Sequence, residues 1–214
     1  SVFSLAEEVL PKESGPAIPR DYGRETDLTP LEAEVSCEME VSMPTFLLGF
    51  KCPPMSGGQE QMRRTLIGEL ACDVLLGDSS PLYARLYSQG LINGTFGYSF
   101  DTLPGVAYAY IGGDSKDPHA VAEEVLQEAR RLVKDCIDPD YYARIVRANY
   151  GSTLKSLNSF ESVAISMAEG CFDGYDPLLF PEMFDSITRE DLTDFIRRNL
   201  VREHMALSVV YPKE

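Results

Sequence analysis

Apolar residues recur along most of this chain with the spacing of either a strand or a helix. From Val35 they alternate with polar residues and then continue through TFLLGFK, which predicts a long or bent strand, or two strands, across 35–51. Steps of three and four residues then predict a helix over 58–76. We expect Gly77 to end that helix in a left-handed conformation.

The most specific local pattern is SSPLYARLYSQGLINGTFGYSF, at 79–100. Ser79 or Ser80 can cap a helix that has Pro81 in its first turn, and Gly90 is placed to end it. The aromatic residues that follow occupy alternate positions, as in a strand. The segment therefore predicts a helix, a glycine turn and a strand.

The remaining elements follow from similar signals. Strands at about 95–101 and 105–112 are close enough to form a hairpin, connected by residues 101–104. Asp-Pro pairs begin a helix over 118–136 and a helical stretch from 139 towards Gly170, which is either one helix bent near Gly151 or two linked helices. The last elements are a helix that begins with a Thr188–Asp191 capping box and ends near Leu200, and a strand over 204–212.

The order strand, helices, hairpin, helices, strand predicts an α+β domain, in which helices cover one face of a mainly antiparallel sheet. Residues 1–34 differ from the rest, because a short helical stretch is followed by four prolines and many charges. We expect a linker or extended arm over 1–34 and a single domain over 35–214.

Composition narrows the classes of function. A net charge of −15 and the lack of a basic patch argue against nucleic-acid binding, although an acidic cavity could attract basic peptides. No apolar run is long enough for a membrane span, and no signal peptide is evident. The five cysteines are widely separated, which favours free thiols in a cytoplasmic protein.

The residues give little support for a zinc site, a serine or cysteine nucleophile, a phosphate loop or a pair of catalytic carboxylates. His119 and His204 lie far apart and no His-x-x-Glu-His is present, whereas catalytic zinc usually needs three protein ligands. No Gly-x-Ser-x-Gly elbow indicates a serine nucleophile, so an independent Ser or Cys hydrolase ranks last. The glycine pairs at 57–58 and 112–113 lack phosphate-loop spacing, and adjacent carboxylates such as Glu123 and Glu124 diverge on a helix.

The string SSPLYARLYSQGLI resembles a helix and Gly-Leu turn of the pitrilysin/insulinase family of zinc peptidases, and VSMPTFLLGFK is similar to that family's strand before its first long helix. The order of the elements agrees over about 35–212. The resemblance implies the carboxy-terminal, non-catalytic half of a two-domain peptidase, with the fold of mitochondrial processing peptidase subunits. Residues 1–34 would be part of the connection between the halves.

In that family the non-catalytic half often supplies an Arg and a Tyr that contact the substrate. Aligning the leucines and the Gly-Leu pair puts Tyr87 at the position of the Arg and Asn93 at that of the Tyr, while Arg85 and Tyr98 lie nearby in a different register. These four residues are the candidate substrate contacts. The alternative is structural, because Asn93-Gly94 is a strong turn pair and Tyr98 can pack beneath the helices.

The resemblance implies a zinc-less half that has no catalytic or metal-binding residue of its own and forms part of a peptide-holding chamber. Zinc and the general base would come from a catalytic domain, in the same polypeptide or a partner chain. A second hypothesis is an assembly or binding module that keeps the fold without a role in proteolysis. The replacement of Arg and Tyr favours this second hypothesis, while the likeness to two-domain bacterial peptidases favours the first.

Overall fold

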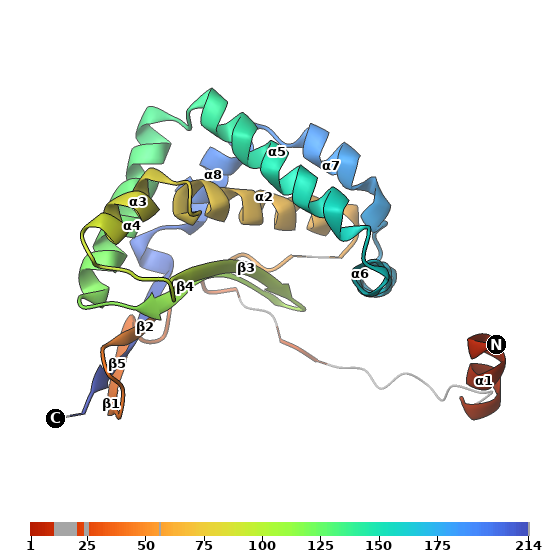
Figure 1. Cartoon of the computed structure of the whole chain (residues 1–214), viewed down its shortest axis with the longest axis horizontal. Helices are drawn as coiled ribbons and strands as arrows, with labels where there is room; N and C mark the ends of the chain where they lie inside the picture. The colour runs from red at the N-terminus through yellow and green to blue at the C-terminus, as the bar shows by residue number, and fades with distance from the viewer. Residues whose placement is uncertain (11–20, 24–25, 56, 214) are drawn as a thin grey trace.

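A mixed five-stranded sheet forms the base of the structure, and helices cover one of its faces (Figure 1). This computed structural model describes residues 1–10, 21–23, 26–55 and 57–213. Its strands are β1 (Glu34–Met39), β2 (Thr45–Cys52), β3 (Gly97–Leu103), β4 (Val106–Asp114) and β5 (Met205–Pro212). Its α-helices are α1 (Val2–Val9), α2 (Gln59–Leu76), α3 (Pro81–Ser88), α4 (Pro118–Asp135), α5 (Pro139–Ser156), α6 (Phe160–Asp173), α7 (Phe180–Ser186) and α8 (Arg189–Asn199). Two 3₁₀ helices, η1 (Pro177–Leu179) and η2 (Arg202–His204), complete them.

The strand order is β1-β5-β2-β4-β3, so β1 and β3 form the two edges of the sheet. The pairs β5–β2, β2–β4 and β4–β3 are antiparallel, and only β1–β5 is parallel. The prediction of an α+β domain with a mainly antiparallel sheet and helices on one face is therefore confirmed. The stretch predicted over 35–51 is two strands, which are not neighbours because β5 lies between them.

The core lies between the sheet and α2. Alternation along β2 turns Phe46, Leu48 and Phe50 towards the helices and leaves Leu47 half exposed on the opposite face. Helix α2 contributes a run of buried residues that includes Leu70 and contacts β3, α4, α5 and α8. This helix is therefore the element that joins the sheet to the outer helices.

Capping residues confirm several predicted helix starts. The hydroxyl of Ser80 accepts a hydrogen bond from the backbone N–H of Tyr83, at 3.0 Å, and Asp117 and Asp138 cap α4 and α5 in the same way. Thr188 and Asp191 form the expected capping box. Asp191 also pairs with Arg63 of α2 at 3.0 Å, so this cap ties α8 to the central helix.

Two local predictions are wrong. Gly77 follows α2 with φ −58° instead of a left-handed conformation, and glycine is needed there because a Cβ would lie 2.6 Å from the carbonyl oxygen of Asp73. The β3–β4 hairpin closes at Pro104 and Gly105, since Asp101 to Leu103 pair with β4, and Gly105 has φ 84°. For the stretch after 139, where one bent helix and two linked helices were both open, the structure has two helices that separate after Ser156, and Gly151 lies inside α5.

The sequence did not predict α7, and its prediction for residues 1–34 can be compared with the structure only in part. Helix α7 is short and begins with Phe180-Pro181, a pair that does not reveal a helix by periodicity. Helix α1 confirms the short helix expected at the start, and it buries none of its residues. The predicted extended arm falls partly on 11–20 and 24–25, which lie outside the described residues.

Replacing Gly68 by alanine tests the close approach between α2 and the sheet. A Cβ at Gly68 would lie 2.4 Å from the Phe100 ring, which is only 4% exposed and packs against Phe195. Since this ring has little room to move, we expect Gly68→Ala to lower the free energy of unfolding by roughly 1–3 kcal/mol. Urea denaturation measures the change.

The matched control is Gly151→Ala, in the interior of α5, where an added Cβ meets nothing within 4 Å. Alanine should stabilise that helix by about 0.5–1 kcal/mol. Equal effects of the two substitutions would contradict a steric role for Gly68.

Candidate functional site

The segment from α3 to β3 carries the predicted substrate contacts. Tyr87 is 57% exposed, and its ring stacks on that of Tyr83 with 5.9 Å between the centroids. Gly90 has φ 65° and ends the helical stretch as predicted. Tyr87 is therefore held by a neighbouring ring and remains open to a partner.

Asn93 forms the turn that leads into β3. Its side-chain oxygen accepts hydrogen bonds from the backbone N–H of Thr95, at 2.8 Å, and from the hydroxyl of Thr95, at 2.6 Å. Its amide nitrogen lies 4.0 Å from the sulfur of Met43, which is a weak acceptor. The side chain thus has a structural role and keeps a donor that a ligand could use.

Arg85 lies on α3 but points to α4. Its guanidinium donates to Glu124 at 3.0 Å and to Glu128 at 3.3 Å. Glu128 is 3% exposed and also accepts hydrogen bonds from Arg131. Burial raises the pKa of this carboxyl, but Arg131 and Arg85 outweigh it and hold the pKa below its ordinary value. Arg85 is engaged in a structural ion-pair network.

Tyr98 lies beneath the helices, on the covered face of the sheet. Its hydroxyl donates to Asp73 of α2 at 2.6 Å, and Asn149 of α5 donates to the other oxygen of the same carboxylate at 2.5 Å. Burial, followed by this bond to Asp73, raises the pKa of the Tyr98 phenol. Asp73 therefore connects β3, α2 and α5, and Tyr98 and Arg85 point to different neighbours instead of a shared site.

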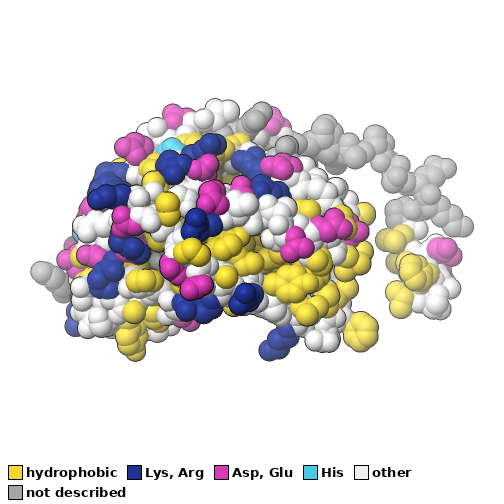
Figure 2. All heavy atoms as spheres, turned by 90° about the horizontal axis from the view of Figure 1, so that it is seen from above, with side chains coloured by type: hydrophobic (Ala, Val, Ile, Leu, Met, Phe, Trp, Pro, Cys, Tyr) yellow, Lys and Arg dark blue, Asp and Glu magenta, His cyan; other side chains and the backbone are white. Residues whose placement is uncertain are grey.

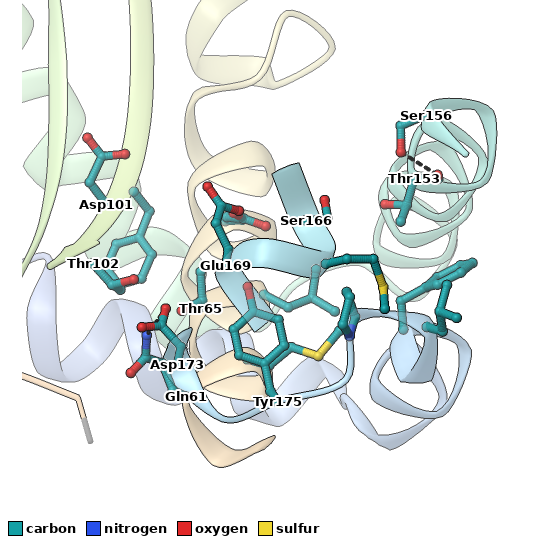
Figure 3. A pocket seen from close by; sticks show the side chains of 18 of the residues that line it. Gln61, Thr65, Asp101, Thr102, Thr153, Ser156, Ser166, Glu169, Asp173 and Tyr175 are labelled. Carbon is teal, nitrogen blue, oxygen red and sulfur yellow. Dashed lines mark hydrogen bonds between the residues drawn. The ribbon is translucent and has the colours of Figure 1, made fainter. Parts of the chain in front are cut away.

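A cavity of about 570 Å³ lies beside this network, between α2, β3, α5, α6 and α7. Figure 3 shows Asp101 and Thr102 of β3 at one side, Thr153 and Ser156 of α5 at the other, and Glu169, Asp173 and Tyr175 between them. Apolar residues complete the walls, among them Leu66, Phe100, Val163 and Phe180. We refer to this cavity as the α2–α6 groove.

The acidic side chains of the groove are Glu69, Asp101, Glu169 and Asp173, and the described residues that line it include no Lys, Arg or His. Glu69 lines the groove and is exposed to solvent, although many protein atoms lie close to its carboxyl group. Desolvation by these atoms, followed by repulsion from Asp73 and Asp101, raises the pKa of Glu69 to about 7. The groove is thus an electronegative recess with apolar walls.

Sequence reasoning did not single out this groove. Glu69 interrupts the apolar run of Leu66, Ile67 and Leu70, and a carboxylate in such a position is the one local signal that could have been noticed. Glu169 and Asp173 lie about a hundred residues further along the chain and meet Glu69 only through the fold.

The described residues contain no group of three or more His, Cys, Asp or Glu side chains placed to hold a metal ion. His119 is half exposed beside Glu34 and Tyr211, and His204 is the last residue of η2, directly before β5. Within the same residues the five cysteines are free, and no helix is long and apolar enough to cross a membrane.

The family model for the M16 peptidase inactive domain matches residues 1–149. The chain belongs to this family. The resemblance to the non-catalytic half of pitrilysin/insulinase-type zinc peptidases is therefore confirmed. A curated relative, the uncharacterized zinc protease YmfH of Bacillus subtilis (strain 168), is 29% identical over 206 residues, which are 95% of this chain and 47% of the relative.

Solved structures show the same fold. An M16-like peptidase from Alicyclobacillus acidocaldarius superposes with a TM-score of 0.90 at 21% identity, over 99% of this chain and 51% of that protein. The inactive peptidase domain of a zinc protease from Bordetella parapertussis gives a TM-score of 0.68 at 15% identity, over 83% of this chain and 95% of that domain. This chain thus spans about half the length of the two longer proteins and most of the single inactive domain.

Because the pKa of Glu69 is raised, the stability of the folded chain should depend on pH. The folded chain holds the proton of the Glu69 carboxyl group more tightly than the unfolded chain does. The stability that this bound proton contributes is therefore lost as the pH rises from about 4.5 to about 7. Glu69→Gln removes the titration, so the variant should gain stability relative to the parent chain across this range. Thermal unfolding at a series of pH values measures the gain, and a constant difference between the two proteins would contradict it.

Proposed function

We propose that this chain is the zinc-less half of a bipartite zinc metallopeptidase and forms one wall of the chamber that holds the peptide. The observation that carries the proposal is the match to the M16 inactive domain, in a chain with only two histidines and no His-x-x-Glu-His. A catalytic half, in the same polypeptide or a partner chain, would supply zinc and the general base. That this chain spans about half of YmfH supports such a division.

The geometry suggests how this half would contribute. Tyr87 is exposed and Asn93 keeps an amide donor, so both can contact a bound peptide. Neither offers the forked positive charge of an arginine, so their contribution would be to binding and orientation. Arg85 and Tyr98 would act indirectly, because both are engaged with carboxylates of neighbouring helices.

A second candidate function is an assembly or binding module that takes no part in proteolysis. The observation that favours it is the presence of Tyr87 and Asn93 where active relatives would carry Arg and Tyr. The two candidates differ in whether hydrolysis depends on these side chains.

Reconstitution with the catalytic half separates them. If this half lines the chamber, peptide hydrolysis should require both halves, and Tyr87→Ala and Asn93→Ala should each lower kcat/KM about three- to tenfold, as expected for the loss of one binding contact. Leu31→Ala, at a fully exposed position outside α3 and its turn, is the control. Assembly without any effect of the two substitutions would favour the second candidate.

The chain alone should neither bind zinc stoichiometrically nor hydrolyse peptides. Metal analysis and a peptidase assay on the isolated chain measure this. Tight binding of one zinc ion, or robust turnover, would overturn the proposal.

A further inference from the structure

The α2–α6 groove is built from apolar walls that extend onto an exposed apolar rim. Leu157 and Met167 line the groove and are also 40% and 43% exposed. Phe160 and Phe172 of α6 are 96% and 88% exposed, and of this helix only Gly170 is buried. Figure 2 shows a continuous apolar area on the helical side of the molecule. Since an apolar helix normally buries its surface, this rim is suited to contact a partner.

The charges of the groove limit what that partner can be. Four carboxylates come from three elements, α2, β3 and α6, and within the part of the chain that the structure describes the lining has no cation that could neutralise them. Among the described residues, Asp173 accepts only a 3.4 Å hydrogen bond from Gln61 at its side chain, and Glu69 and Glu169 have no ion-pair partner. A cation would relieve the repulsion in this recess, whereas an anion or a purely apolar segment would not.

The groove also opens onto an unpaired strand edge. Phe100 and Thr102 point to one face of β3 and Asp101 and Leu103 to the other, yet all four line the groove. The groove therefore runs along the edge of β3, which among the described strands pairs with β4 alone. Backbone N–H and C=O groups on that edge are available to an added strand.

We propose that the α2–α6 groove binds an extended peptide segment that pairs with the free edge of β3 and inserts a Lys or Arg side chain between Glu69, Asp101 and Glu169. The aliphatic stem of such a side chain packs against Leu66 and Phe100, while its charged end meets the carboxylates. An apolar residue beside it in the peptide covers part of the exposed rim. The identity of this peptide as a substrate rests on the proposed function, but the binding itself does not.

The binding test uses the isolated chain and needs no catalytic half. The probe is a fluorescein-labelled octapeptide with a central Leu-Lys-Leu and no other charged side chain. Its comparison peptide carries norleucine in place of the lysine, and a third peptide carries N-methyl groups on the backbone nitrogens that would pair with β3. We expect the lysine peptide to bind at least about tenfold more tightly than either comparison peptide, as read by fluorescence anisotropy.

Variants of the chain identify the site. At about pH 8, above the pKa of about 7 of Glu69, Glu69→Gln and Glu169→Gln should each weaken the lysine peptide about three- to tenfold and reduce the dependence of its affinity on salt, because each removes a negative charge from the groove. Glu182→Gln, an exposed carboxylate of α7 outside the lining, is the matched control and should leave the affinity unchanged. Circular dichroism checks that each variant is folded.

Three results would overturn the proposal: equal binding of the lysine and norleucine peptides, no loss of affinity in the two groove variants, or equal binding of the N-methylated peptide. Sedimentation supplies a fourth, in which the chain forms a dimer that Phe160→Asp dissociates, since the rim would then bind a second copy. None of these results depends on hydrolysis. They therefore do not test the proposed chamber role, which the reconstitution experiment tests separately.

Discussion

The contact of helix α2 with the sheet is the constraint on which the rest of the structure depends. Gly68 lacks a side chain where the ring of Phe100 reaches the helix, and the same ring packs edge-on against Phe195 of α8 at 5.2 Å. Around this contact, Asp73 links α2 to β3 and α5, and Arg63 links it to the start of α8. The position of α2 thus determines where three other elements lie.

The α2–α6 groove is a consequence of that arrangement. Helix α2 presents Glu69 beyond its buried side, and α6 packs against η1 instead of the sheet, so the two helices leave a space beside β3. Glu69 is the carboxylate that carries the cost of this arrangement, because nearby protein atoms displace water from it and Asp73 and Asp101 repel its charge. No cation among the described lining residues offsets this repulsion, which is consistent with the raised pKa of Glu69.

The four candidate substrate contacts separate into two kinds once the structure is known. Tyr87 is exposed on a helix surface, and Asn93 lies partly buried in a turn with an amide donor that meets only the weak sulfur acceptor of Met43. Arg85 donates hydrogen bonds to Glu124 and Glu128, and Tyr98 donates one to Asp73, so both side chains have a structural role. Proximity in the sequence placed the four together, but side-chain direction along the helix and the strand divides them.

Local signals in the sequence were sufficient to predict most of the helices and strands and to identify the family. Caps at Ser80, Asp117 and Thr188 act within one helical turn, and the alternation along β2 follows from the two-residue repeat of a strand. Such rules did not give the conformation of Gly77 or the meeting of Glu69 with Glu169, because each depends on residues distant in the chain. The sequence by itself thus determined the strands, most of the helices and the family. Only the tertiary structure decided which charges share a recess and which strand edge stays free, since desolvation and pairing arise when distant segments pack together.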